Sequence, residues 1–372
     1  MSWRRATARS LWEAGASRLL APIDARWRAA DEALSAADDG TRFPESHWDV
    51  RTLIAVFPAG SPFHFLNLNL LLGPTGVAFD RPDRLNGLRG EHAFDLQLCL
   101  EGEQGVTSYK RTHPLSELRY EQGSVALEMQ GRGNEPHLTL EGGWPRYEIH
   151  CVQPSEELAL TLVFEAKPRL QWWVRLPKLY SHCSLFGTLT MRWTLADRNG
   201  TLEVPALLDH GWGRNVLPLR APLNRFRYEV LHLPNGVQGA SLNAEGPFGA
   251  PLRTSGALHW DHDDKLSFEC FHHRTAASEV FENYAGVPCQ VPLSWSGSMR
   301  CAAGRFDYQA ERATPARPLL GDGFLYGFEY QGRWHSNPRA PRRALTPPIA
   351  DLGLFTDRGY AEQMGSAWHL GG

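Results

Sequence analysis

The sequence lacks a long apolar run and an excess of basic charge. No stretch of about 18 or more apolar residues occurs, so no transmembrane helix is expected. The 38 Lys and Arg are offset by 41 Asp and Glu, which gives a formal net charge of −3 at pH 7. This balance offers no electrostatic basis for holding a phosphate backbone, and no nucleic-acid partner is expected. Arg4, Arg5 and Arg9 precede no apolar segment of the kind that a secretory signal needs, which favours a cytoplasmic location.

The sequence also lacks the signatures of several common enzyme classes. There is no GxSxG, no P-loop and no GxGxxG between a strand and a helix, so serine hydrolase, kinase and dehydrogenase functions lose their usual support. The six cysteines are scattered and form no CxxC pair, which favours reduced thiols. The segment 259–264 and the pair His272–His273 hold metal-capable side chains, but strand alternation would send neighbours to opposite faces. We therefore expect no metal site and no cofactor.

What the sequence does contain is turn residues and aromatic rings, with 35 Gly, 26 Pro, 17 Phe, 13 Trp and 10 Tyr. From residue 48 onward, apolar and polar residues alternate in short segments that Gly, Pro or Asn-Gly punctuate, for example at Asn199-Gly200 and Asn235-Gly236. This rhythm predicts an all-β fold of short antiparallel strands in a barrel or sandwich. It recurs with similar length in the two halves of the chain, without an exact repeat.

Four regions are predicted from these patterns. Residues 1–37 carry Trp and Leu at helical spacing among Arg residues, which indicates either a helix packed on the protein body or an amphipathic element with peripheral membrane contact. Residues 167–179 are interpreted as a crossing between the two halves, and 275–284 and 360–365 as short helices. The predicted organisation is a helical segment at 1–44, a first barrel at 45–175, a second barrel at 176–337 and a coil tail at 338–372.

Two linked motifs differ from the rest of the chain. The first, residues 176–189, contains His182 and Ser184 before Gly187-Thr188-Leu189. The second is Asp209-His210-Gly211-Trp212-Gly213. A predicted strand, turn and strand join them, and this hairpin would bring the His182 region close to Asp209.

The order of these motifs resembles that of the carotenoid 1,2-hydratase and AttH-like family, whose architecture lipocalin-like Diels–Alderases share. The close resemblance covers residues 176–213. It implies two tandem lipocalin-like antiparallel β-barrels. In the hydratases, the Asp of this motif and nearby His, Tyr and Trp residues are implicated in adding water across a terminal double bond. The resemblance places those roles on Asp209, with His182 and Trp212 alongside, and the fold transfers more readily than the reaction.

The residue types fit acid–base chemistry on an apolar substrate. An apolar setting disfavours a charged carboxylate, which suits Asp209 as a general acid, and His182 or His210 could activate water or relay the proton. Aromatic faces stabilise a cation formed from an alkene. The predicted ligand-binding residues are Trp172, Trp173, Tyr180, Trp193, Trp212, Glu329 and Tyr330. A structural interpretation competes, in which Asp209 to Gly213 form a corner at the barrel end and Trp212 plugs the barrel.

Two functions follow from these alternatives. The first is an enzyme that hydrates, isomerises or cyclises a terpenoid, steroid, polyketide or similar lipid in an aromatic-lined barrel pocket. The second is a non-catalytic, lipocalin-like carrier of a hydrophobic ligand of the same class, in which Asp209 has only a structural role.

Overall fold

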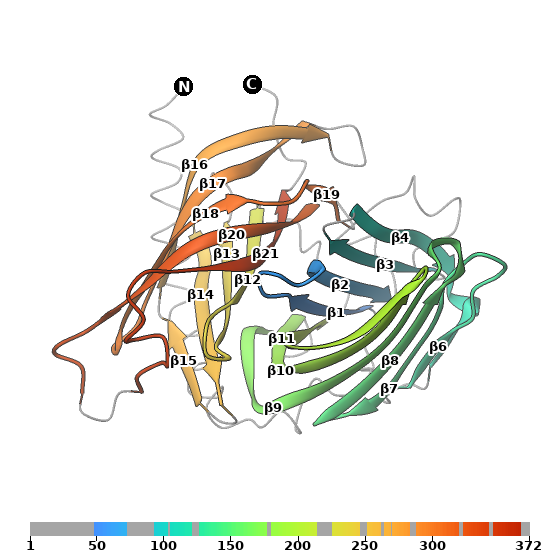
Figure 1. The fold of residues 1–372 in the computed structure, drawn as a ribbon, viewed down its shortest axis with the longest axis horizontal. Helices are drawn as coiled ribbons and strands as arrows, with labels where there is room; N and C mark the ends of the chain where they lie inside the picture. The colour runs from blue at the N-terminus through green and yellow to red at the C-terminus, as the bar shows by residue number, and fades with distance from the viewer. Residues whose placement is uncertain are drawn as a thin grey trace. The chain divides into compact units, whose positions relative to one another are not determined.

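The described part of the chain is almost entirely antiparallel β-strand, as the computed structural model shows (Figure 1). It comprises residues 48–72, 93–102, 105–120, 126–176, 180–213, 225–245, 251–261, 264–268, 270–282, 288–319, 323–341 and 345–365. The predicted all-β class is confirmed. The predicted N-terminal helical segment and its membrane contact lie outside these residues. Within them, no helix has the length and hydropathy that crossing a bilayer requires.

The described residues divide into two compact units, one within 48–213 and the other within 225–365. The first unit is one 11-stranded sheet, blue to light green in Figure 1. Its strands are β1 (Trp48–Val56), β2 (Phe63–Leu72), β3 (Ala93–Gly102), β4 (Gly105–Pro114), β5 (Leu118–Tyr120), β6 (Leu127–Met129), β7 (His137–Gly143), β8 (Arg146–Gln153), β9 (Leu158–Leu176), β10 (Tyr180–Leu195) and β11 (Arg198–Gly213). Two short 3-10 turns, η2 (Leu115–Glu117) and η3 (Pro154–Glu156), accompany them.

The strand order curls the first sheet into a nearly closed barrel. The order is β4-β3-β2-β1-β11-β10-β9-β8-β7-β6-β5, so β4 and β5 lie at opposite ends of the hydrogen-bonded path. In the sequence, however, only η2 separates Pro114 from Leu118. Four residue steps span at most about 14 Å, so the two ends of the sheet must approach each other.

The second unit repeats this plan. Its strands are β12 (Arg225–His232), β13 (Gln238–Glu245), β14 (Pro251–Trp260), β15 (Asp264–Phe268), β16 (Cys270–Glu282), β17 (Pro288–Arg300), β18 (Gly304–Arg312), β19 (Arg317–Pro318), β20 (Gly323–Ser336) and β21 (Phe355–Gly365). The order is β15-β14-β13-β12-β21-β20-β18-β17-β16, and one residue separates the end strands β15 and β16 in the sequence. In both units the first strand pairs with the last, β1 with β11 and β12 with β21. The predicted pair of tandem antiparallel barrels is confirmed.

Each unit has its own hydrophobic core on one face of its sheet. The first core includes Phe94, Leu185 and Met191, and the second includes Met299 and Phe328, all of them buried. Burial alternates along the strands, as the pattern eBiBeBeB of β8 shows, because successive side chains of a strand point to opposite faces. The period-two signal in the sequence therefore marked real strands.

One of the two predicted Asn-Gly turns is confirmed and the other is displaced. Asn235 and Gly236, with φ of 59° and 70°, connect β12 to β13 as a tight hairpin turn. Asn199 and Gly200 instead pair with Thr194 and Trp193 inside the β10–β11 ladder, and Ala196, with φ of 52°, makes the turn. Gly200 packs closely there, since a Cβ would lie 3.0 Å from the ring of Trp193.

The structure corrects the predicted crossing between the halves. Residues 167–176 continue β9 rather than leave the sheet. A register shift sets residues 167–169 opposite Phe186 alone, and such a bulge accommodates Pro168, which cannot donate to the ladder. The predicted boundary at 175–176 therefore falls within the first sheet, and β10 and β11 belong to the first unit because β11 pairs with β1.

The two predicted helices are also wrong, and the predicted coil tail is wrong over residues 355–365, whereas the described residues 338–341 and 345–354 are coil or turn. Residues 275–282 pair with β17 as part of β16. Residues 355–365 form β21, which hydrogen-bonds to β12 on one side and β20 on the other. In both places tertiary pairing outweighs the local sequence pattern, because a barrel sheet needs these strands to continue its ladder.

Candidate functional site

A hydrogen-bonded chain of four side chains crosses β9, β10 and β11. His182 Nε2 lies 2.5 Å from Asp209 Oδ2, and the hydroxyl of Ser184 donates to Asp209 Oδ1. Trp173 Nε1 donates to Ser184 Oγ at 2.5 Å. His182 and Ser184 are two residues apart and so share a face of β10, and Ser184 stands directly opposite Asp209. The predicted proximity of His182 to Asp209 is confirmed.

Burial differs among the four hydrogen-bonded side chains. Ser184 and Trp173 are fully buried, whereas the side chains of Asp209 and His182 keep 13% and 16% of their exposure. The solvent-accessible end of this row of hydrogen bonds is therefore an imidazole in contact with a carboxylate. Such a pair can hold and transfer a proton, and the buried Ser184 and Trp173 fix its orientation.

Asp209 belongs to a row of polar residues that crosses the sheet in register. One residue from each of seven neighbouring strands contributes, namely Lys110, Gln97, Asn69, Thr52, Asp209, Ser184 and Gln171. This polar row lies on the face opposite the hydrophobic core of the first unit, since Leu53 and Leu208, the neighbours of Thr52 and Asp209, belong to that core. Gln97, Asn69 and Gln171 are buried despite their polarity.

His210 does not join Asp209, because strand alternation sends it to the core face. There His210 Nε2 lies 2.7 Å from Asp49 Oδ2, and Arg51 Nε donates to Asp49 Oδ1 at 3.2 Å. Burial alone would raise the pKa of Asp49, but the charges of His210 and Arg51 outweigh it and lower that pKa. All three side chains are buried, so they form a structural ion cluster rather than an accessible site.

Trp212 and Trp172 also lie on the core face. The Trp212 ring centroid is 4.4 Å from that of His210 and 5.8 Å from that of Trp172. This packing favours the predicted plugging role of Trp212. The predicted corner at Asp209 is not present, because β11 continues through Gly213.

The other predicted ligand-binding residues lie apart from Asp209. Trp193 is nine residues along β10 from Ser184, roughly 30 Å away, and packs edge-on against Phe63. Glu329 is in the second unit, with 55% of its side chain exposed beside Arg358. Tyr330 is buried there and donates its hydroxyl to a backbone carbonyl.

For Tyr180 only the backbone is described, paired with Gly213. Of the predicted residues, the structure thus brings together His182, Asp209 and Trp173 on one face of the sheet, and His210, Trp212 and Trp172 on the other. Their functional roles stay predictions.

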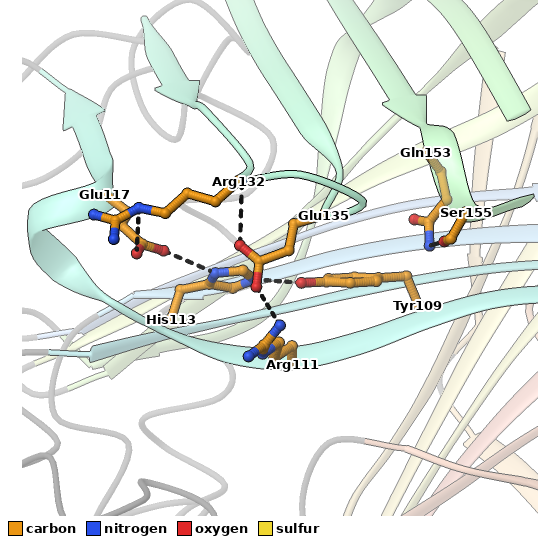
Figure 2. Close-up of polar contacts among 8 residues, drawn as sticks. All are labelled: Tyr109, Arg111, His113, Glu117, Arg132, Glu135, Gln153 and Ser155. Atoms are coloured by element: carbon orange, nitrogen blue, oxygen red, sulfur yellow. Dashed lines mark hydrogen bonds and ion pairs between the residues drawn. The ribbon is translucent and has the colours of Figure 1, made fainter. Parts of the chain in front are cut away.

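A second polar cluster closes the seam of the first barrel (Figure 2). The hydroxyl of Tyr109 lies 2.7 Å from His113 Nε2, and His113 Nδ1 lies 3.1 Å from Glu117 Oε2. Tyr109 and His113 come from β4, and Glu117 from η2, which leads into β5. The imidazole is buried and stacks on Phe94 at 5.1 Å. The contacts tie the last strand before the seam to the turn that crosses it.

This cluster includes the metal-capable group His113, Glu117 and Glu135, whose ligand atoms lie within 4.8 Å of one another. Arg111, however, contacts Glu135, and Arg132 Nε lies 3.6 Å from Glu117. Both carboxylates are thus already charge-compensated, and both nitrogens of His113 are engaged. The geometry fits a clasp between strands better than a cation site.

Sequence reasoning placed Ser184 in the motif but gave it no role, and it missed Asp49 and Arg51. The role of Ser184 could have been found, because the spacing His182-x-Ser184 puts both side chains on one face of a strand. Asp49 and Arg51 carried no such signal, because Asp49 meets His210 only through the pairing of β1 with β11, across 161 positions of the sequence.

The fold is similar to that of two solved proteins. Kievitone hydratase from Nectria haematococca matches with a TM-score of 0.56 and 10% identity, over 90% of this chain and 94% of that one. A protein of Nitrosomonas europaea provisionally named AttH matches with a TM-score of 0.55 and 11% identity, over 86% and 91% of the two chains. At these identities the likeness shows the fold alone. It supports the AttH-like fold without singling out a carotenoid hydratase.

Matches at the level of sequence are fewer. No curated protein matches this chain. A family model does match, over residues 133–342, which is more than half of the chain. The protein therefore belongs to the family of unknown function DUF6670.

Proposed function

We propose that this protein is an enzyme that transforms an apolar small molecule by acid–base chemistry at His182 and Asp209. The observation that carries the proposal is the 2.5 Å contact between His182 Nε2 and Asp209 Oδ2, at the accessible end of a buried hydrogen-bonded chain. Substrates of this class are terpenoids, steroids, polyketides and similar lipids. The reaction is a hydration, an isomerisation or a cyclisation, and acid–base groups suffice for each of them.

In a hydration, the His182–Asp209 pair gives its proton to one alkene carbon, and the π electrons form the new C–H bond. The neighbouring carbon becomes cationic, and a water oxygen attacks it. The proton that this water loses returns to the pair, so both residues end in their starting state. In an isomerisation the cation instead loses a proton from another carbon to the pair. In a cyclisation a second double bond of the substrate attacks the cation, and the new cation that this forms loses a proton to the pair, so a ring bond is made and both residues end in their starting state.

The surrounding residues support this scheme. Ser184 donates to Asp209 and accepts from Trp173, so it positions the carboxylate. The polar row offers hydrogen-bonding groups beside Asp209, and Asn69 Oδ1 and Gln171 Oε1 have no partner among the described residues. A substrate with an apolar body and an oxygen-bearing group fits such a surface. The fold likeness to a protein named as a hydratase makes hydration the first reaction to test.

The test uses the purified full chain and an apolar extract of the source cells, incubated in water enriched in oxygen-18. Mass spectrometry should find a compound that gains one molecule of labelled water, or one whose retention time changes at constant mass. Asp209→Asn keeps the side-chain shape and removes the charge, and should lower turnover by at least about a hundredfold. Asp307→Asn is the matched control, since Asp307 also accepts from a serine, Ser298, at 2.6 Å and faces a histidine at 3.3 Å.

Full turnover by a folded Asp209→Asn variant would contradict the proposal. Recovery of one identical, chemically unchanged lipid from both wild type and variant would favour the carrier function instead.

A further inference from the structure

The second unit carries a polar centre inside its aromatic core. Arg227 Nε donates to Glu229 Oε1 at 2.5 Å, and the hydroxyl of Tyr308 donates to the other oxygen of Glu229. Arg227 and Glu229 come from β12, and Tyr308 from β18. The carboxylate of Glu229 has no solvent exposure, and the Arg227 side chain has 4%.

These side chains point toward the core of the second unit. Glu229 and Leu231 are two residues apart on β12, and Leu231 belongs to that core. The guanidinium carbon of Arg227 lies 4.2 Å from the centroid of the Trp295 ring and 5.9 Å from that of Tyr326. A charged group thus stands among aromatic faces, which stabilise it by cation–π attraction.

Arg227 remains charged in this setting. Burial lowers the pKa of Arg227, but its interactions with Tyr326, Glu229 and Tyr308 outweigh burial and raise that pKa. Burial raises the pKa of Tyr326 to about 12, so its hydroxyl keeps its proton and can donate.

The polar centre has more donors than acceptors. Among the described residues, Arg227 Nη1 and Nη2, Tyr326 Oη, Ser241 Oγ and Trp295 Nε1 are buried and meet no hydrogen-bond partner. A guanidinium and an indole can only donate. Both oxygens of Glu229 are already engaged by Arg227 and Tyr308. Native structures rarely leave a buried donor unpaired, because its desolvation is then uncompensated.

We propose that this polar centre binds the carboxylate of an apolar ligand inside the second unit. Glu229 accepts the hydrogen bond from Nε of Arg227, which leaves both Nη atoms available to a ligand. Their spacing matches that of the two oxygens of a carboxylate. Ser241, which stands opposite Glu229 on β13, and Tyr326 add hydroxyl donors. The aromatic rings provide apolar surroundings for the rest of the ligand. This site shares no residue with the His182–Asp209 pair and does not depend on the function proposed for it.

The probes are sodium benzoate and its neutral analogue benzamide, titrated against the full chain by calorimetry. Benzoate should bind, and benzamide at least about tenfold more weakly, because it lacks the charge that strengthens hydrogen bonds from a guanidinium. Arg227→Met should abolish benzoate binding. Arg305→Met, on the outer face of β18, is the control and should leave it unchanged, since Arg305 pairs with Asp307 instead.

Tyr326→Phe keeps the test decisive if Arg227→Met does not fold. It removes one oxygen atom that lacks a partner, so the variant should be at least as stable as wild type. Its affinity for benzoate should fall by at least about threefold. Absence of benzoate binding to wild type, or equal affinity in wild type and Tyr326→Phe, would overturn the proposal and leave ordered water as the partner of these donors.

Discussion

Two histidine–aspartate pairs lie on opposite faces of the same strand, and their burial separates their roles. On one face of β11, Asp209 meets His182, and both side chains keep some exposure. On the other, His210 meets Asp49, with exposures of 1% and 6%. A proton must reach a substrate to do chemistry, so only the first pair suits catalysis. The second pair is buried with Arg51, and such clusters matter mainly for folding.

The buried pair predicts a specific dependence of stability on pH. The pKa of Asp49 is lowered below its usual 3.8, because His210 and Arg51 outweigh the opposing effect of burial. A carboxylate with a lowered folded-state pKa stabilises the protein above its unfolded pKa, and this stabilisation is lost as pH falls through the folded value. Asp49→Asn should therefore cost about 3 kcal/mol of unfolding free energy at neutral pH, since it leaves Arg51 buried without its charge partner.

Urea unfolding of wild type and Asp49→Asn across a pH series measures this cost. The difference between the two proteins should shrink as the pH falls below about pH 4. Asp307→Asn, at a more exposed ion pair, should show a smaller difference throughout. A difference between wild type and Asp49→Asn that stays constant down to about pH 3 would show that the charge of Asp49 does not contribute.

Among the elements, the seam between β4 and β5 is the place where the first barrel has no continuous ladder. β5 and β6 are three residues each, the shortest strands of the first sheet, and follow the turn that holds Glu117. With few backbone hydrogen bonds, this end of the sheet depends on side-chain contacts. The Tyr109–His113–Glu117 clasp supplies them from β4 (Figure 2).

Glu117→Gln tests the clasp. It keeps the side-chain size and removes the charge that faces His113 and Arg132, and should cost about 1 kcal/mol. Hydrogen exchange should accelerate in β5 and β6 and stay unchanged in β10 and β11. Glu148→Gln is a matched control, because Glu148 also lies between an arginine and a histidine, but on an exposed face. Unchanged exchange in β5 and β6 would show that the seam is held by other contacts.

The strands also show which parts of the fold could be predicted from the sequence. Strands in which buried and exposed residues alternate, such as β8 and β18, were predictable, because this alternation appears in the sequence as alternating apolar and polar residues. β21 was not, since what makes it a strand is its place between β12 and β20, and β12 lies more than a hundred positions earlier. The same holds for the site. The neighbours His182 and Asp209 were predictable from one hairpin, whereas Arg227 and Tyr308 meet only in the folded barrel.

At the scale of the whole molecule, the two units share a connection pattern and differ in where their polar side chains lie. Each begins with four strands, crosses its seam in a few residues and ends on a strand that pairs with the first. Both units bury charged side chains on the core face, Asp49, Arg51 and His210 in the first and Arg227 and Glu229 in the second, and the first unit also carries the polar row on its opposite face. One plan can thus support two kinds of site, an accessible acid–base pair and a buried cation.

Separate closure and separate cores predict that the two units unfold as distinct cooperative blocks. Leu189→Ala removes a buried side chain from the first core, and Met299→Ala removes one from the second. Each should cost about 2–5 kcal/mol, through lost burial and the cavity left behind. Scanning calorimetry of the full chain should resolve two transitions, and each variant should lower the midpoint of one transition only. A single transition that both variants move would mean that the two units unfold as one cooperative block, because a cavity in either core then lowers the stability of the whole protein.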